Sequence, residues 1–142
     1  MDRLPSETDP IPSAPASGTA PGKRVLIVDD APDARMCIAR ELASLGFEVD
    51  GAATPEEAIE RVRAQRHDLV VIDVNLGHEI DGFELTRRLL AEPGREELRV
   101  VIVSGLVREH TVVDAREAGA FTAIEKPNSW SGFGAVVAPL VA

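Results

Sequence analysis

The stretch that decides the fold reads RVLIVDD and covers residues 24–30. Four apolar residues follow Arg24 without a polar interruption, which is typical of a strand buried on both faces. The run ends at two adjacent carboxylates, Asp29 and Asp30. A strand buried on both faces needs helices above and below its sheet, so the stretch predicts the first strand of a parallel α/β fold.

Similar apolar runs recur along the chain and alternate with segments of helical spacing. Strands are predicted at residues 47–50, 68–73, 99–103 and 121–125, and helices at residues 31–45, 54–66, 81–91, 109–118 and 132–141. The second helix has a clear start signal, with Thr54 as N-cap, Pro55 in the first position and Glu57 able to complete a capping box. This alternation predicts a flavodoxin-like doubly wound (βα)5 fold with a five-stranded parallel sheet in the order 2-1-3-4-5.

Composition divides the chain into a tail and one domain. Residues 1–22 hold five of the ten prolines and, after Met1, only two large apolar side chains, Leu4 and Ile11. Such a segment buries too little surface to offset its ordering entropy, so we expect a flexible Pro-rich N-terminal tail. The remaining residues, 23–142, have the length of a single domain.

Composition also excludes several classes of protein. A hydrophobic content of 44% with 27% charged residues excludes a wholly disordered chain, a coiled coil and a collagen-like repeat. The net charge of −9 opposes binding to nucleic acid or to an anionic membrane surface. A single cysteine, Cys37, excludes an intrachain disulfide and a thiolate metal cluster. The sequence shows no signal peptide and no apolar run of ~20 residues, so we expect a cytoplasmic protein.

Polar side chains occupy the carboxyl ends of four predicted strands. They are Asp29, Asp30, Asp73, Ser104 and Lys126. Ligand sites of open parallel sheets form at these ends, where the strand order reverses. In the order 2-1-3-4-5 the first and third strands are neighbours, so three carboxylates converge and need a cation or a proton. Oxygen ligands without cysteine or a nearby histidine favour Mg²⁺.

The expected ligands of this magnesium site differ in their roles. We expect Asp30 and Asp73 to bind Mg²⁺ directly and Asp29 to act through a water molecule. Asn75 is expected to contribute its backbone carbonyl. The Asp29–Asp30 pair taken alone is equally compatible with helix capping, but the polar residues at the matching ends of the other strands favour the metal site.

This constellation resembles the receiver domain of bacterial two-component response regulators, over residues 23–127. The resemblance is carried by VDD at residues 28–30, VIDVNL at 71–76, DG at 81–82, VSG at 103–105, AGA at 118–120 and EKP at 125–127. Each motif alone is weak, whereas their order and spacing together are specific.

The resemblance implies that Asp73 is a phosphoacceptor, which takes a phosphoryl group from a phosphohistidine of a sensor histidine kinase. Ser104 would donate a hydrogen bond to a phosphoryl oxygen, while Lys126 and Mg²⁺ would neutralise its charge. The chain would then be a single-domain response regulator in a phosphorelay, signalling by contact with an unknown downstream protein. It would not be an enzyme beyond Mg²⁺-dependent self-phosphotransfer and autodephosphorylation. The alternative is a degenerate receiver that works by phosphorylation-independent docking or dimerisation.

Several positions depart from the family pattern. Ala123 stands where an aromatic ring is usual, and Phe121, on the same face of the strand, is a candidate replacement. Gly77 replaces a usual proline in the loop after the third strand, where we expect His78 to be a solvated loop residue rather than a metal ligand. Leu106 cannot position water, so we expect a long-lived phosphoaspartate.

The C-terminal segment is unusually apolar. Trp130 and Phe133 are either buried structural rings or the anchors of an interface, and we predict a homodimer through this region. Two further classes are disfavoured. An aspartyl-phosphate hydrolase would need a second acid where Asn75 stands, and flavin or dinucleotide binding would need a glycine fingerprint after the first strand.

Overall fold

The computed structural model of the chain describes residues 23–77, 79–95 and 97–140. The predicted tail, residues 1–22, and the loop residue His78 lie outside the described residues, so the predictions about them remain predictions.

The sheet has five parallel strands, as predicted from the sequence. Their bounds are β1 Arg24–Val28, β2 Glu48–Ala52, β3 Leu69–Asp73, β4 Arg99–Ser104 and β5 Thr122–Glu125. They are hydrogen-bonded in the order β2-β1-β3-β4-β5, with every neighbouring pair parallel. The predicted flavodoxin-like topology is confirmed, and it makes β1 and β3 direct neighbours.

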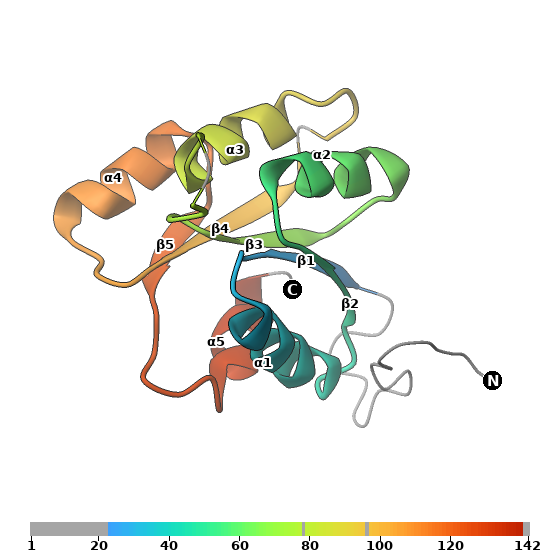
Figure 1. Cartoon of the computed structure of the whole chain (residues 1–142), viewed down its shortest axis with the longest axis vertical. Coiled ribbons are helices and arrows are strands. Elements are labelled where there is room, and N and C mark those ends of the chain that lie inside the picture. Colours follow the sequence, from blue (N-terminus) through green and yellow to red (C-terminus); the bar gives the residue numbers. More distant parts are fainter. Residues whose placement is uncertain (1–22, 78, 96, 141–142) are drawn as a thin grey trace.

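Helices cover both faces of this sheet. Their bounds are α1 Pro32–Ala43, α2 Pro55–Ala64, α3 Gly82–Leu90, α4 Glu109–Glu117 and α5 Phe133–Val137, followed by a short 3-10 helix, η1 Ala138–Leu140. Figure 1 shows α2, α3 and α4 on one side of the sheet and α1 and α5 on the other. The last predicted helix, residues 132–141, is therefore replaced by a five-residue α-helix and a 3-10 turn.

Local capping signals are realised at two helix starts. The hydroxyl of Thr54 accepts a hydrogen bond from the Glu57 amide at 3.1 Å, and the Glu57 carboxylate accepts one from the amide of Ala53 at 2.7 Å. The carboxylate thus caps the residue before the N-cap rather than the N-cap itself. At α3, the Asp81 carboxylate accepts from the amide of Glu84 at 2.9 Å. These bonds satisfy backbone donors that the helices cannot pair internally.

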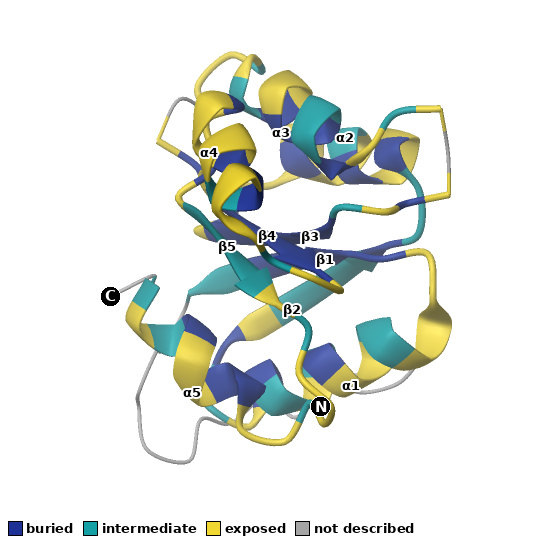
Figure 2. Cartoon of the chain, turned by 90° about the vertical axis from the view of Figure 1, so that its left-hand side faces the viewer, coloured by how far each residue is buried: buried dark blue, intermediate teal, exposed yellow. Residues whose placement is uncertain are grey.

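The core has two layers, one on each face of the sheet. Along β1, Leu26 and Val28 belong to the layer under α2, α3 and α4, while Val25 and Ile27 belong to the layer against α1 and α5. Successive side chains of a strand point to opposite faces, so a central strand contributes to both layers. Figure 2 shows this as a buried central sheet between helices whose inward faces are buried.

The C-terminal rings pack inside the domain. Phe133 is 3% exposed, and the Trp130 ring meets it edge-on with 5.0 Å between ring centroids. Gly134, the second residue of α5, lies close to α1. A Cβ added at this glycine would stand 3.0 Å from the carbonyl oxygen of Glu41. Of the two interpretations of Phe133, the buried structural ring is correct.

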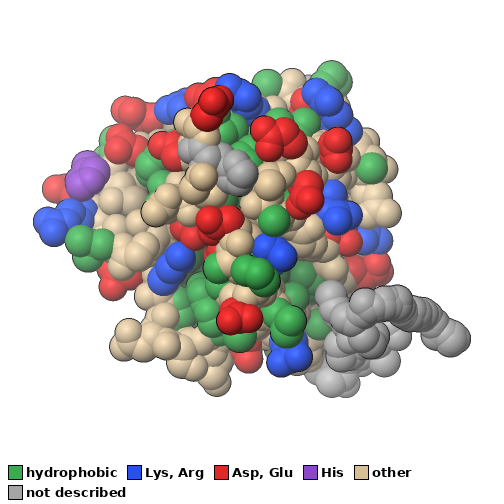
Figure 3. Space-filling model, viewed as in Figure 1, with side chains coloured by type: hydrophobic (Ala, Val, Ile, Leu, Met, Phe, Trp, Pro, Cys, Tyr) green, Lys and Arg blue, Asp and Glu red, His purple; other side chains and the backbone are tan. Residues whose placement is uncertain are grey.

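The face of the molecule drawn in Figure 3 carries acidic and basic side chains beside hydrophobic ones. Over the layer of α2, α3 and α4, acidic and basic side chains are interspersed (Figure 3). No helix within residues 23–77, 79–95 and 97–140 has the length and apolar character needed to cross a membrane.

Candidate functional site

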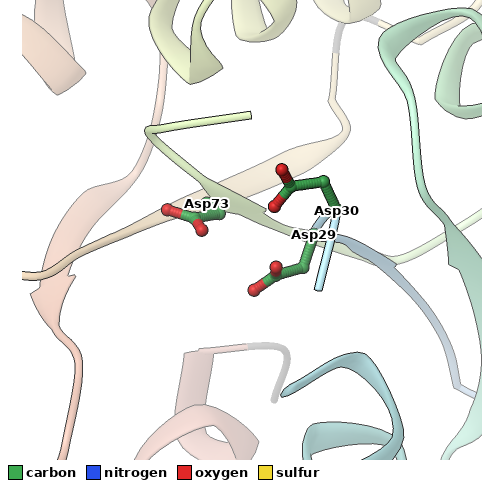
Figure 4. A group of neighbouring side chains, drawn as sticks. All are labelled: Asp29, Asp30 and Asp73. Carbon is green, nitrogen blue, oxygen red and sulfur yellow. The ribbon is translucent and has the colours of Figure 1, made fainter. Parts of the chain in front are cut away.

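The carboxyl ends of β1 and β3 bring three aspartates together. Val28 pairs with Ile72 in the register, so the residues that follow them emerge side by side. Carboxylate oxygens of Asp29, Asp30 and Asp73 all lie within 4.8 Å of one another, and Figure 4 shows the three groups gathered at the two strand ends. Two of them, Asp29 and Asp73, are 3% and 6% exposed. The convergence predicted from the strand order is present.

Lys126 reaches this cluster from the end of β5. Its Nζ donates a hydrogen bond to Oδ2 of Asp73 at 2.9 Å. Partial burial acts to lower the pKa of Lys126, but the hydrogen bond and the negative charges of Asp73, Asp29 and Asp30 outweigh it, so the pKa is raised. The ammonium group therefore stays charged beside the phosphoacceptor candidate.

One ammonium group does not balance three carboxylates. Burial raises the pKa of Asp29, and the nearby charge of Asp73 raises it further, against the opposing hydrogen bond from the Ala31 amide. The folded chain thus holds a carboxylate in a place that disfavours its negative charge. This is the setting in which a cation at the site lowers the free energy most.

The donor set fits Mg²⁺. Three carboxylates offer hard oxygen ligands within 4.8 Å of one another, and part of the site is open because Asp30 is exposed. Asn75 is also at the rim, where its backbone N–H donates to Oδ1 of Asp73 at 3.1 Å. The proposed role of the Asn75 carbonyl as a ligand remains a prediction.

Ser104 lies at the end of β4, next to Val103, which pairs with Asp73 in the register. Its hydroxyl donates to the carbonyl oxygen of Leu106 at 3.0 Å and accepts from the Leu106 amide at 3.4 Å. The side chain is 9% exposed. The hydroxyl is therefore near the site but is engaged with the loop that follows β4.

Arg35 of α1 is a site residue that the sequence analysis missed. Its Nη1 donates to the carbonyl oxygen of Asp29 at 2.6 Å, which fixes the backbone between the two adjacent aspartates. The side chain crosses β2 at Gly51, where an added Cβ would stand 3.2 Å from Cδ of Arg35. Nothing in the local sequence pairs a helix arginine with a strand glycine, because the contact exists only after α1 packs beside β2.

Two glycines bring backbone close to the acidic cluster. Gly77 has a φ of 69°, and an added Cβ would lie 2.9 Å from Oδ2 of Asp30. Proline cannot adopt this φ, so the loop conformation seen here is incompatible with proline at this position. Gly82, at the start of α3, leaves only 2.8 Å between an added Cβ and the carbonyl oxygen of Asp73.

The candidate replacement for the missing aromatic ring is wrong. Phe121 is 44% exposed, and its ring lies under the guanidinium of Arg99, with 4.6 Å between Cζ of Arg99 and the centroid of the Phe121 ring. Its amide donates to the carbonyl of Val100, whereas Ser104 pairs with Glu125 at the other end of β5. Phe121 thus stands at the amino end of the strand, away from the site. The two-residue period of a strand does not say how far a residue lies from the carboxyl end of the strand.

A comparison of the sequence with known protein families gives a result that agrees with this fold and site geometry. Residues 25–135 match the model of the response regulator receiver domain. The chain belongs to this family. Receiver domains work in two-component signalling, where they interact with sensor histidine kinases and bind Mg²⁺ in an acidic pocket. Here the three aspartates form an acidic cluster that could hold a metal ion.

Relatives of this receiver domain differ widely in length. The chemotaxis protein CheY of Thermotoga maritima is 33% identical over 108 residues, which cover 75% of this chain and 87% of that protein. A gliding motility regulatory protein of Myxococcus xanthus is 37% identical over 111 residues, 78% of this chain but only 14% of that protein. A crystal structure of a response regulator from Thermotoga maritima has a TM-score of 0.73 at 27% identity and covers 84% of this chain and 97% of its own.

Proposed function

We propose that this receiver domain accepts a phosphoryl group on Asp73 from a phosphohistidine of a sensor histidine kinase. The observation that supports this most is the meeting of Lys126 Nζ with Asp73 at 2.9 Å inside a cluster of three carboxylates. A positioned carboxylate, a fixed cation and a place for a hard metal ion are what phosphoryl transfer to aspartate requires.

The residues of the chain prepare Asp73 for the transfer. Its Oδ1 accepts from the Asn75 amide and its Oδ2 from Lys126, so the carboxylate is held in one orientation. A bond forms from a carboxylate oxygen to phosphorus as the phosphorus–nitrogen bond of the phosphohistidine breaks, and the electron pair returns to the imidazole. Mg²⁺, held directly by Asp30 and Asp73 and through a water molecule by Asp29, would neutralise charge on the phosphoryl oxygens.

After the transfer, a phosphoryl oxygen on Asp73 would be a new acceptor for the Ser104 hydroxyl. In the unphosphorylated structure this hydroxyl donates to the Leu106 carbonyl, and donation to a phosphoryl oxygen would require that bond to break. The loop after β4 would then move, which is how we propose that phosphorylation changes the surface offered to a partner.

The direct test is labelling with acetyl phosphate in the presence of Mg²⁺. We expect the wild-type protein to gain one acid-labile acyl phosphate, and Asp73→Ala and Asp73→Asn to gain none, because the attacking oxygen is gone or replaced by an amide. Asp114→Asn, which removes an exposed carboxylate from α4, is the matched control and should label normally. Undiminished labelling of both Asp73 variants would refute the proposal.

We also propose that the chain acts as a single-domain regulator, which signals to an unknown downstream protein and forms a homodimer through its C-terminal region. The 87% coverage of the CheY relative supports the single-domain reading, and the half-exposed Val136 on α5 supports the dimer. Its own chemistry would be confined to self-phosphotransfer and autodephosphorylation.

A phosphorylation-independent docking module is the second candidate, because Ala123 leaves no ring on β5 to couple the site to the surface. Beryllofluoride, a mimic of the phosphoryl group, separates the two functions. A change in the sedimentation coefficient or in partner affinity on adding beryllofluoride and Mg²⁺ supports the switch. The same oligomeric state and affinity with and without the mimic support the docking module.

A further inference from the structure

The loop between β4 and α4, residues 105–108, is held by two side chains that face each other across neighbouring strands. Ser104 and Glu125 are partners in the register of β4 and β5. The Ser104 hydroxyl is bonded to both backbone groups of Leu106, and Oε1 of Glu125 accepts from the amide of Val107 at 3.2 Å. The loop is therefore tied to the sheet at two successive residues.

The two ties are not independent. The Ser104 hydroxyl has a single proton, and that proton is donated to the Leu106 carbonyl. The hydroxyl can donate elsewhere only when this carbonyl moves or the hydroxyl rotates away from it. Because Glu125 holds the very next residue, Val107, it restrains the position of the Leu106 carbonyl.

Glu125 is also connected to the proposed phosphorylation site through the backbone. It precedes Lys126, whose amide donates to the Ser104 carbonyl at 2.7 Å and whose side chain contacts Asp73. Two positions earlier, Ala123 brings only a methyl group to the sheet face under α4. Within the described part of β5, Glu125 is thus the side chain with a hydrogen bond to the loop.

We propose that Glu125 is a positioning residue, which holds the β4–α4 loop before phosphotransfer and so keeps the Ser104 hydroxyl on Leu106. This inference rests on the proposed function of Asp73. If Glu125 has this role, the affinity for a phosphoryl group depends on the hydrogen bond from Val107 to Glu125. The group binds the conformation in which the loop is free, and reaching that conformation requires this bond to break.

The test compares Glu125→Ala with Glu125→Gln. Both variants lose the negative charge, but glutamine keeps an oxygen that accepts from the Val107 amide, so their ratio isolates the hydrogen bond from the charge. In a titration with beryllofluoride at fixed Mg²⁺, we expect Glu125→Ala to bind about threefold to tenfold more tightly than Glu125→Gln, the range that one such bond covers.

Amide hydrogen exchange, measured without a phosphoryl donor or beryllofluoride, reports directly on the hydrogen bonds of the β4–α4 loop. We expect the Val107 amide to exchange faster in Glu125→Ala and to be protected in Glu125→Gln as in the wild type. Equal beryllofluoride affinities and equal Val107 exchange in the two variants would overturn the positioning role. Failure of the wild type to label on Asp73 would instead overturn the proposed function, and with it the step that this loop is proposed to control.

Discussion

The two ends of the sheet hold aspartates in opposite electrostatic settings. At the carboxyl ends, burial and the charge of Asp73 raise the pKa of Asp29. Asp50, in the middle of β2, contacts groups at the amino ends of other strands, where the hydrogen bond from the buried His67 lowers its pKa, with Nε2 to Oδ2 at 2.8 Å. The charge of Arg24, whose guanidinium lies 3.4 Å from Asp50, lowers it further.

The difference separates a site kept ready for a ligand from a network that holds the fold. Three carboxylates around one ammonium group leave negative charge that a cation can neutralise. Without a bound cation, this cluster therefore lowers the free energy of unfolding of the protein. Around Asp50, the partners lie within the chain: β1 supplies an arginine and the segment before β3 a histidine. That network ties the edge strand β2 to β1 and to the segment before β3, and it needs no ligand.

The largest expected effect is on metal binding. Asp30→Asn should weaken Mg²⁺ binding by about tenfold to a hundredfold, because it removes a charged oxygen from the cluster. Isothermal titration calorimetry measures the affinity, with Asp33→Asn, an exposed aspartate in the first turn of α1, as control. Equal affinities of Asp30→Asn and the wild type would show that the cluster does not bind the ion as proposed.

A smaller effect is expected at the other end of the sheet. Asp50→Asn should lower the free energy of unfolding at pH 7 by about 1–2 kcal/mol, since it weakens charge-assisted bonds to His67 and Arg24. The folded pKa of Asp50 lies below its ordinary value of 3.8, so its contribution is complete above that pH and is lost as the pH falls through the folded pKa.

Urea titrations at a series of pH values test this prediction. The gap between the wild type and Asp50→Asn should be constant at neutral pH and should close in acid below pH 3.8. Asp114→Asn on α4 serves again as the control. A gap that persists unchanged into strong acid would mean that the loss comes from packing and not from charge.

The smallest effect should have the opposite sign. In the absence of Mg²⁺, Asp29→Asn should raise the free energy of unfolding at pH 7 by on the order of 1 kcal/mol, because an amide avoids the unfavourable charge and still accepts from the Ala31 amide. The raised pKa of Asp29 means that the wild type regains this stability as the pH falls through the folded value.

Thermal unfolding in a chelator, at neutral and at acid pH, measures this difference. The variant should be the more stable protein at pH 7, and the two curves should approach each other in acid. A variant less stable than the wild type at pH 7 would show that Asp29 is needed for the fold itself, and the contrast between the two ends of the sheet would fail.

Features set by neighbours in the sequence were predictable. The apolar runs gave strands whose bounds differ from the prediction by a few residues, as with β2, which begins after Phe47 and extends to Ala52. The start of α2 at Thr54 and Pro55 follows from a capping pattern within four residues. The strand-end aspartates were predictable too, because the order of a parallel sheet makes residues distant in the chain into neighbours.

Features that depend on how elements pack were not predictable. The arginine that holds the Asp29 carbonyl, Arg35, needs the bare backbone of Gly51 on another element. The position of Phe121, just before β5, was misjudged because the two-residue period of a strand does not define a distance from the site. The Ser104 hydroxyl is bonded to the loop because the loop folds back over the end of β4.

The sequence by itself determined the layered fold and the residue types at each strand end, since hydrophobic period and turn signals act over short distances in the chain. Only the tertiary structure decided the directions in which the pKa values of Asp29 and Asp50 are shifted, and the contacts of the loop after β4. A carboxylate such as Asp29 or Asp50 is chemically the same in both places, and its pKa depends on burial and on charges from other strands. Those neighbours exist only once the sheet has formed.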